Sequence, residues 1–347
     1  MENILDLDFE DIDGVLKSMD QPSYRGRQIM KWIWDRGVSD FELMTNVSKA
    51  LRTRLAEKYS VFVPEVRQAL QSIDGTRKFL LGLYDGKVIE SVLIPSSGHY
   101  TQCVSTQAGC SLGCLFCSTG KMGFERNLAS GEIAGQILAA RRFLAENQDP
   151  MAVSNVVFMG MGEPLLNWGQ VRKALGIIRD PDALNFSRRK VTLSTVGIRK
   201  NLEEFGRSAT ALLAVSLHAP DQELRKKIMP GASRYELDDL IADLESYPLA
   251  PRERITIEYV MLKGVNDSLA HAGKLVKKLS RVKCKINLLK YNPGNDPVFE
   301  PSDEETIHGF QDFLRSRGLT VMLRKSMGAD ILAACGQLKA RDLDNKY

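Results

Sequence analysis

GCSLGCLFCSTG, residues 109–120, is the stretch on which the interpretation of this chain depends. It places Cys110, Cys114 and Cys117 in a C-x3-C-x2-C spacing. A closed zinc site or iron–sulfur cubane takes four ligands, whereas three thiolates leave one iron of a cubane open. The spacing favours a [4Fe-4S] cluster whose open iron can bind the amino and carboxylate groups of S-adenosylmethionine. A structural zinc site completed by a distant residue is the alternative, although zinc sites usually pair C-x2-C with a second such pair.

Composition places the chain among ordinary soluble globular proteins. It has 347 residues, of which 44% are hydrophobic and 26% charged, and 47 basic against 43 acidic residues give a net charge of +4. This balance is too mild to indicate nucleic-acid binding by itself. No apolar run reaches the length of a membrane span, and the acidic start MENILDLDFEDID is unlike a secretory signal. We therefore expect a cytoplasmic protein without membrane contact, whose six cysteines serve metal binding or catalysis.

The pattern from about residue 100 onward alternates strands with helices. Expected strands are 102–105, 155–159, 190–195, 211–217, 254–261, 285–289 and 320–324. Expected helices are 130–145, 168–179, 199–205, 235–247, 268–280 and 303–317. Such units predict parallel strands joined by crossover helices, in a barrel or a doubly wound sheet, with chemistry on the loops after the strands.

The first hundred residues differ from this pattern. Residues 1 to about 65 read as helices, with an apolar stripe at Ile29, Trp32 and Ile33. Two β-rich runs then flank Asp85-Gly86, which is a strong hairpin signal. We expect three parts: a helical accessory domain at 1–70, a β-hairpin extension at 71–98, and the α/β core at 99–347.

Glycine and polar residues follow several of the expected strands. They are GMGEP at 160–164, Ser194, Ser216-Leu217-His218, and Asn292 in YNPG. Glycines at a strand end allow close approach to a ligand, and Glu163 could accept a hydrogen bond from an ammonium group. His218 taken alone is more often a hydrogen-bonded structural histidine. Because such residues recur at several strand ends, we expect them to line one shared site.

Four further residues have a common structural interpretation when each is taken alone. Cys103 and Cys335 would be small buried apolar residues, as would Cys284, to which we assign no role. Glu90, in VIESVLIP, would be a solvated strand residue.

Basic and aromatic residues gather in three places that could contact RNA. They are Tyr24, Arg25, Arg27, Lys31 and Trp34; Arg188, Arg189 and Lys190; and Arg225, Lys226 and Lys227. Basic side chains would contact phosphates and aromatic rings could stack on unpaired bases, while a solvated helix face is the alternative for each cluster.

Seven motifs taken together resemble one family. They are CVSTQAGCSLGCLFCSTGKMGFERNL, FMGMGEPLLN, VTLSTVGI, SLHAP, IEYVMLKGVND, KINLLKYNP and RKSMGADILAACGQL. The chain resembles, from about residue 20 to 340, the bacterial radical S-adenosylmethionine enzymes that methylate carbon 2 of adenine in 23S rRNA and tRNA. The resemblance implies a partial (β/α)6 TIM-like barrel with the N-terminal accessory domain. A relative that methylates adenine carbon 8 carries alanine where this chain has Pro164, so carbon 2 is favoured and carbon 8 stays open.

The resemblance also implies residue roles. Cys110, Cys114 and Cys117 would hold the [4Fe-4S] cluster, and S-adenosylmethionine would bind at Gly162, Glu163, Ser194, Ser216, Leu217, His218 and Asn292. Cys335 would be methylated, Cys103 would form a transient disulfide with it, and Glu90 would accept a proton. Two molecules of S-adenosylmethionine would be used per turnover: one methylates Cys335, and one yields the radical that activates this methyl group for addition to adenine.

The family likeness further implies partners. An external electron donor such as flavodoxin with its reductase, or ferredoxin, would supply electrons, and the enzyme would act as a monomer. Two rival functions use the same residues: a zinc-stabilised RNA-binding protein without catalysis, and a radical enzyme that acts on a small molecule or a protein.

Overall fold

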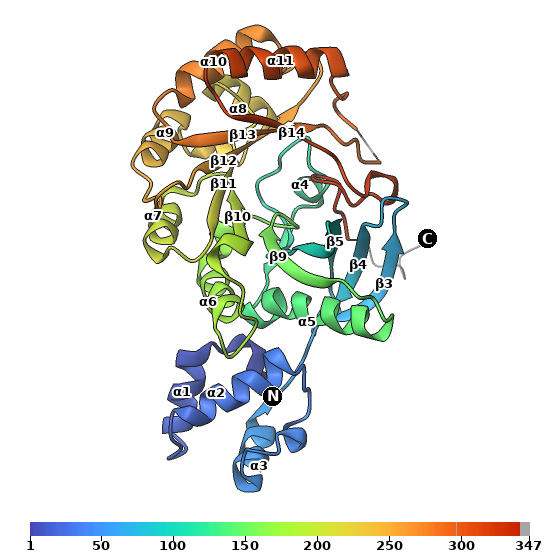
Figure 1. Ribbon diagram of the computed structural model, residues 1–347, viewed down its shortest axis with the longest axis vertical. Helices are drawn as coiled ribbons and strands as arrows, with labels where there is room; N and C mark the ends of the chain where they lie inside the picture. Colours follow the sequence, from blue (N-terminus) through green and yellow to red (C-terminus); the bar gives the residue numbers. More distant parts are fainter. Residues whose placement is uncertain (296, 341–347) are drawn as a thin grey trace.

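A ten-stranded sheet organises most of the chain in the computed structural model, which describes residues 1–295 and 297–340. Within these residues seven neighbouring strands run parallel (Figure 1). They are β6 (His99–Cys103), β9 (Ala152–Phe158), β10 (Val191–Thr195), β11 (Leu212–Ser216), β12 (Ile255–Met261), β13 (Cys284–Lys290) and β14 (Val321–Arg324). The expected strands agree with these bounds to within a few residues, so the predicted partial barrel is confirmed.

Helices connect the parallel strands and cover the outside of the curved sheet (Figure 1). They are α5 (Ser130–Glu146), α6 (Trp168–Arg179), α7 (Arg199–Ser208), α8 (Gln222–Ile228), α9 (Leu237–Glu245), α10 (Leu269–Leu279) and α11 (Glu304–Ser316). In α6 the buried side chains Val171, Ala174, Leu175 and Ile178 recur every three or four residues, which places them on the face toward the sheet. α8 was not expected from the sequence.

Three antiparallel strands extend the sheet beyond β6. They are β3 (Glu65–Gln71), β4 (Arg77–Gly82) and β5 (Val88–Ser96), and β5 pairs with β6 so that Val92 faces Cys103. Asp85-Gly86 forms the turn between β4 and β5, with Gly86 at φ +84°, which favours glycine. The extension therefore has three strands and belongs to the main sheet. The boundary that we place near residue 70 lies within β3.

The N-terminal residues form a separate small helical layer (Figure 1). It contains α1 (Phe9–Lys17), α2 (Tyr24–Met30), a π-helical turn at Lys31–Asp35 and α3 (Lys49–Lys58). The parallel pair β1 (Glu2–Asn3) and β2 (Tyr59–Ser60) closes it. Trp34 is fully buried in the hydrophobic core, so the expectation that it stacks on RNA bases is wrong.

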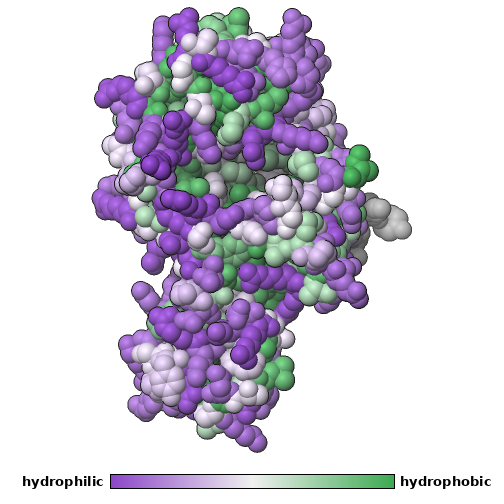
Figure 2. All heavy atoms as spheres, in the orientation of Figure 1, coloured by the Kyte–Doolittle hydropathy of each residue, from purple (hydrophilic) through white to green (hydrophobic). Residues whose placement is uncertain are grey.

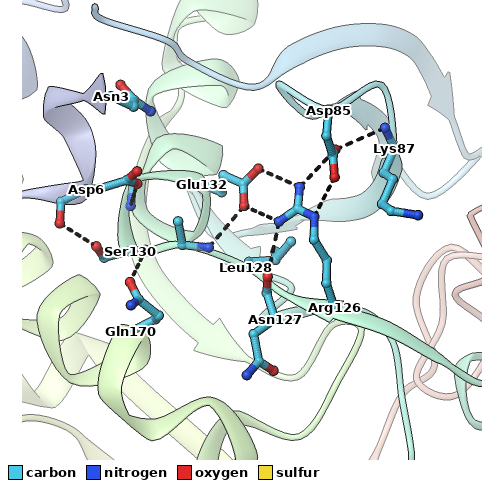
Figure 3. A network of polar contacts seen from close by, with 12 residues as sticks. Asn3, Asp6, Asp85, Lys87, Arg126, Asn127, Leu128, Ser130, Glu132 and Gln170 are labelled. Atoms are coloured by element: carbon cyan, nitrogen blue, oxygen red, sulfur yellow. Dashed lines mark hydrogen bonds and ion pairs between the residues drawn. The ribbon is translucent and has the colours of Figure 1, made fainter. Parts of the chain in front are cut away.

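A polar network joins this layer to the barrel and to the sheet extension (Figure 3). Asp6 accepts a hydrogen bond from the backbone N–H of Gly131 (3.0 Å), at the start of α5. Arg126 forms paired contacts with Glu132 on one side (2.7 and 2.9 Å) and with Asp85 on the other (2.7 and 2.9 Å). The position of α5 is therefore set by contacts from all three parts of the chain.

Two short elements surround the cysteine motif. β7 (Gln107–Gly109) pairs with β8 (Phe124–Asn127), and α4 (Ser118–Met122) lies between them in sequence. The C-terminal segment, residues 325–340, then passes α4 and the strands of the sheet extension (Figure 1). Among the described residues, every helix is too short or too polar to cross a bilayer.

Candidate active site

A cavity of about 170 Å³ lies where the parallel strands end. Side chains reach it from the loops after β6, β9 and β13, from β10, β11 and β12, and from the C-terminal segment. Its lining includes Cys110, Cys114, Cys117, Gly162, Glu163, Ser194, Ser216, His218, Glu258, Asn292 and Cys335. This face of the molecule is hollowed, with hydrophobic residues inside the hollow and hydrophilic residues around its rim (Figure 2). The structure thus brings together most of the predicted site residues at one mouth.

The cysteine loop is held in a fixed shape by backbone hydrogen bonds. The N–H of Cys110 donates to Gly123 O (2.7 Å), and the N–H of Cys117 donates to Cys114 O (3.1 Å). Gly109 has φ +74°, and a Cβ there would lie 2.0 Å from the carbonyl oxygen of Gly123, so only glycine fits. The loop therefore presents its three thiols on one side, toward the cavity.

The three thiols suit a cluster better than a single ion. Burial raises the pKa of Cys110 to about 12 and also raises the pKa of Cys114, and charge on the neighbouring cysteines contributes to both shifts. Such thiols need a cation to stay ionised. In residues 1–295 and 297–340, no three His, Cys, Asp or Glu side chains converge closely enough to hold one metal ion. A cubane takes each thiolate on a different iron, so it accepts a wider set.

Glu163 faces the cavity but is already engaged by the protein. Its carboxylate accepts hydrogen bonds from Thr195 Oγ1 (2.6 Å), the N–H of Val196 (3.0 Å) and the N–H of Leu165 (3.0 Å). Burial raises the pKa of Glu163 and these three donors lower it, with burial the larger effect. Glu163 therefore fixes the loop after β9 to the end of β10, and an ammonium group would be an additional partner.

The serines and histidine of the later strands lie next to each other. Ser194 Oγ and Ser216 Oγ are 3.4 Å apart and both line the cavity. Nδ1 of His218 accepts from the N–H of Val260 (3.0 Å), and burial together with the charge of Arg225 lowers the pKa of His218 to about 3. His218 is thus neutral, with its proton on Nε2. The side chain of Leu217 is fully buried and does not line the cavity.

The two cysteines that are remote in sequence lie near each other. Cys335 is exposed in the cavity and Cys103 is buried, and both are free thiols. Although the residue is exposed to the cavity, the protein atoms around its sulfur keep water away from it, which raises the pKa of Cys335 to about 11, and the charge of Glu258 adds to this shift. Burial also raises the pKa of Cys103, and negative charge on Cys335 adds to this shift. The two thiols are therefore within electrostatic reach, and Cys335 stands on an irregular segment after the short helix at Ala329–Ile331.

Glu90 is buried behind this segment, so the expectation of a solvated strand residue is wrong for it. Its Oε1 lies 2.9 Å from Lys78 Nζ, and its Oε2 accepts from the N–H of Lys339 (2.8 Å). Lys78 and Lys339 line a second, smaller cavity, which shares Phe116 and Tyr291 with the larger one. Glu90 therefore lies behind two residues, Lys78 and Lys339, that line the smaller cavity.

Sequence reasoning missed one charged residue of the cavity, Glu258, and predicted the wrong environment for another residue, Arg225. Glu258, on β12, lines it and accepts from Asn287 Nδ2 (2.9 Å). Arg225 is fully buried and donates to the carbonyl oxygens of Val196, Ala232 and Tyr235, so its expected contact with RNA phosphates is wrong. In retrospect, Glu258 could have been found from the sequence because it lies on the expected strand 254–261, beside the site. The sequence carries no signal for the burial of Arg225.

Other expected RNA contacts have protein partners. Arg27 forms an ion pair with Asp182 (2.8 Å) and lies over the ring of Phe9. Arg188 contacts Glu253. Tyr24 is exposed, with the guanidinium of Arg25 over its ring. The N-terminal layer thus keeps an exposed basic and aromatic edge.

Comparison with known families matches two segments of the chain. Residues 2–61 match the ribosomal RNA large subunit methyltransferase N-terminal domain. Residues 104–275 match the radical SAM superfamily. The first match covers the helical layer, and the second covers the cysteine loop and most of the barrel.

Curated relatives extend over nearly the whole chain. Proteins named dual-specificity RNA methyltransferase RlmN are 51% identical in Nitratidesulfovibrio vulgaris strain DP4 (99% of this chain, 96% of that protein) and 49% identical in Solidesulfovibrio magneticus (98% and 97%). The crystal structure of a radical SAM methyltransferase from Sphaerobacter thermophilus superposes with a TM-score of 0.90 at 38% identity, covering 98% of this chain and 100% of that one.

Proposed function

Since the chain belongs to the RlmN family of radical SAM RNA methyltransferases, we propose that it methylates carbon 2 of adenine in 23S rRNA and in tRNA. One observation carries the proposal: the three thiols of the cysteine loop and the thiol of Cys335 line the same cavity. The electrostatic reach between Cys335 and Cys103 supports a thiol-based methyl relay.

Carbon 2 of adenine requires unusual chemistry because it is an electron-poor C–H carbon. It cannot attack a sulfonium methyl group, so a polar methyl transfer to it is excluded. When bound, the [4Fe-4S] cluster and S-adenosylmethionine supply the radical chemistry that activates a methyl group for this carbon. Cys110, Cys114 and Cys117 would hold the cluster. Gly162, Glu163, Ser194, the backbone of Ser216 to His218, and Asn292 would hold S-adenosylmethionine.

Cys335 would carry the methyl group before it reaches RNA. Its sulfur would attack the methyl carbon of S-adenosylmethionine, and S-adenosylhomocysteine would leave with the electron pair of the broken bond. The thiol proton would be lost in the same step. The pKa of Cys335, raised to about 11, means that the thiol must give up its proton during this step. Its exposure in the cavity gives the sulfur access to the sulfonium.

Glu90 and Cys103 would complete the reaction on the side of the sheet extension. Glu90 takes the carbon 2 proton after the new carbon–carbon bond has formed, because the adduct makes this proton acidic. The Cys103 thiolate would then attack the Cys335 sulfur, and the electron pair of the broken S–C bond would pass to the transferred carbon, which takes a proton to become the methyl group. The unpaired electron of the adduct would leave to the bound cluster. A thiol reductant restores both cysteines.

Several features of the working enzyme belong to the same proposal. The N-terminal residues 1–70 would bind RNA through their exposed basic edge, residues 71–98 would form the extension that carries Glu90, and residues 99–347 the catalytic core. The target adenine must leave its stack to reach the cavity. Flavodoxin with its reductase, or ferredoxin, would supply electrons, and the enzyme would act in the cytoplasm as a monomer.

The test compares three cysteine variants expressed in a strain that lacks the endogenous activity. Cys335→Ala abolishes 2-methyladenosine in total RNA measured by mass spectrometry. Cys103→Ala leaves protein covalently joined to RNA, because the last bond cannot break. Cys284→Ala changes a buried cysteine at the start of β13, whereas the cavity-lining residues Leu289 and Lys290 lie at the other end of that strand, so this variant retains activity. Methylation by Cys335→Ala, or RNA-free Cys103→Ala protein, would refute the relay.

A further inference from the structure

Lys78 joins the expected proton acceptor to the segment that carries Cys335. Its Nζ lies 2.9 Å from Glu90 Oε1 and donates to the carbonyl oxygen of Leu332 at 3.3 Å. The side chain of Lys78 is only 11% exposed and that of Glu90 8%, so water screens the pair weakly. Lys78 thus bridges β4 and β5 to a residue three positions before Cys335.

The second oxygen of Glu90 holds the same segment beyond Cys335. Oε2 accepts from the backbone N–H of Lys339 at 2.8 Å. One carboxylate therefore fixes the C-terminal segment on both sides of the reactive thiol, through Lys78 on one side and directly on the other. Charge-assisted hydrogen bonds of this kind are about twice as strong as neutral ones, so their strength depends on the ionisation of Glu90.

The part of the segment between these contacts can change shape. Gly328 and Gly336 have φ of +69° and +83°, and Leu332 has φ +54°, in the left-handed region. Other contacts hold the segment before Leu332 and at Gly336. Asp74 accepts from the N–H of Gly328 (2.8 Å), Asp330 accepts from Ser72 Oγ (2.6 Å) and from the N–H of Ile73 (3.2 Å), and Gly336 O accepts from the N–H of Ser118 (2.7 Å). Between Asp330 and Gly336, the segment is held at Leu332 by the hydrogen bond that Lys78 donates to its carbonyl oxygen.

Lys78 also stands between Glu90 and the space where a base could lie. Lys78, Leu332 and Lys339 line the smaller cavity, while Glu90 lines neither cavity. A substrate that gives a proton to Glu90 must therefore displace one of the two groups that cover its carboxylate. Proton transfer and the position of the Cys335 segment are coupled by this arrangement.

Resting on the proposed function, we infer that Lys78 is a positioning residue that holds the Cys335 segment in its methyl-accepting position only while Glu90 is ionised. When the C–H bond at carbon 2 breaks, its electron pair stays with the adenine ring and the proton goes to Glu90. The neutral carboxyl then holds Lys78 and the N–H of Lys339 less strongly. The part of the segment from Leu332 to Gly336 is released, and Cys335 moves toward Cys103 for disulfide formation.

The experiment measures this release without turnover, in anaerobically purified protein that holds its cluster. Lys78→Met and Glu90→Gln are compared with wild type, with Lys78→Arg, which keeps the charge, and with Lys87→Met. Lys87 is an exposed lysine of the same extension, paired with Glu125. Hydrogen exchange is followed in peptides covering 328–340, and the Cys103–Cys335 disulfide formed with oxidised glutathione is followed by mass spectrometry.

We expect exchange and disulfide formation to be about tenfold faster in Lys78→Met and in Glu90→Gln. Lys78→Arg and Lys87→Met should stay within about twofold of wild type. Unchanged rates in Lys78→Met would overturn the inference. So would equal acceleration across peptides of β4 and β5, because this would indicate general loosening of the sheet.

If Lys78→Met does not fold, Glu90→Gln makes the same comparison. Because neither measurement requires RNA, failure of the methyl relay would show in the Cys335→Ala test and leave these rates interpretable.

Discussion

Replacing Glu163 by glutamine tests whether the shape of the cavity depends on an ionised carboxylate rather than on the size of the side chain. The wild-type carboxylate accepts from Thr195, Val196 and Leu165 at 2.6 to 3.0 Å, and only 3% of the residue is exposed. In the variant one oxygen becomes an NH₂ group, which cannot accept. At least one buried donor, the N–H of Val196 or of Leu165, then loses its partner.

The expected magnitude follows from two opposing effects. An unpaired buried donor costs about 1–3 kcal/mol, and a hydrogen bond to a charged group contributes about 1.5–3 kcal/mol. The variant also removes a buried charge, and because burial raises the pKa of Glu163, this removal returns part of the loss at neutral pH. The lost hydrogen bonds dominate, so we expect a net destabilisation of about 2–3 kcal/mol, or a melting temperature lower by about 4 °C.

Differential scanning calorimetry at pH 7.5 measures this shift. The matched control is Glu125→Gln, whose carboxylate is 48% exposed and paired with Lys87. The control should change the free energy of unfolding by less than about 1 kcal/mol, as exposed ion pairs do. A Glu163→Gln protein that melts at the wild-type temperature, or above it, would refute the reasoning. The ionised carboxylate would then make no net contribution to the free energy of unfolding, or would lower it.

Three further perturbations have defined outcomes. Burial raises the pKa of Asp6 from 3.8 to about 6, so stability falls as pH rises between these values, and Asp6→Asn should be more stable than wild type above pH 6, by about 1 kcal/mol in chemical denaturation, but not at pH 4. His218 should show no titration between pH 5 and 8 in NMR spectra, because its pKa is about 3, and a midpoint near 6.5 would contradict the buried neutral ring. Gly162→Ala should lose soluble expression or binding of S-adenosylmethionine in equilibrium dialysis, since a Cβ would lie 2.5 Å from the Cβ of Gln107 at φ +95°, while Gly169→Ala, with open space around it, should behave as wild type.

The barrel could be predicted from the sequence because the signal for each of its helices and strands lies within the element itself. The expected helix at 168–179 coincides with α6, and its buried residues recur at helical spacing. The hairpin at Asp85-Gly86 was also visible, since a tight turn leaves a short motif. Its union with β6 in one sheet was not visible, because strand pairing between distant segments leaves no pattern in either of them.

The charged residues show where local reasoning ends. Arg225 lies in the basic run RKK and reads as exposed, yet three backbone carbonyls surround its guanidinium. Glu90 reads as a solvated strand position, and only the family resemblance singled it out. Lys78 carries no motif at all. In each case the partner is distant in sequence, so the interaction that fixes the side chain is absent from its neighbourhood along the chain.

The C-terminal segment that brings Cys335 to the cavity is also the part of the site that a ribosome makes last. The loop with Cys110, Cys114 and Cys117 precedes it by more than two hundred residues in the printed sequence. A cluster delivered to the growing chain would therefore meet this loop before the sulfur of Cys335 has emerged. Cys335 would then not compete for the metal, and the C-terminal segment would cover a finished cluster.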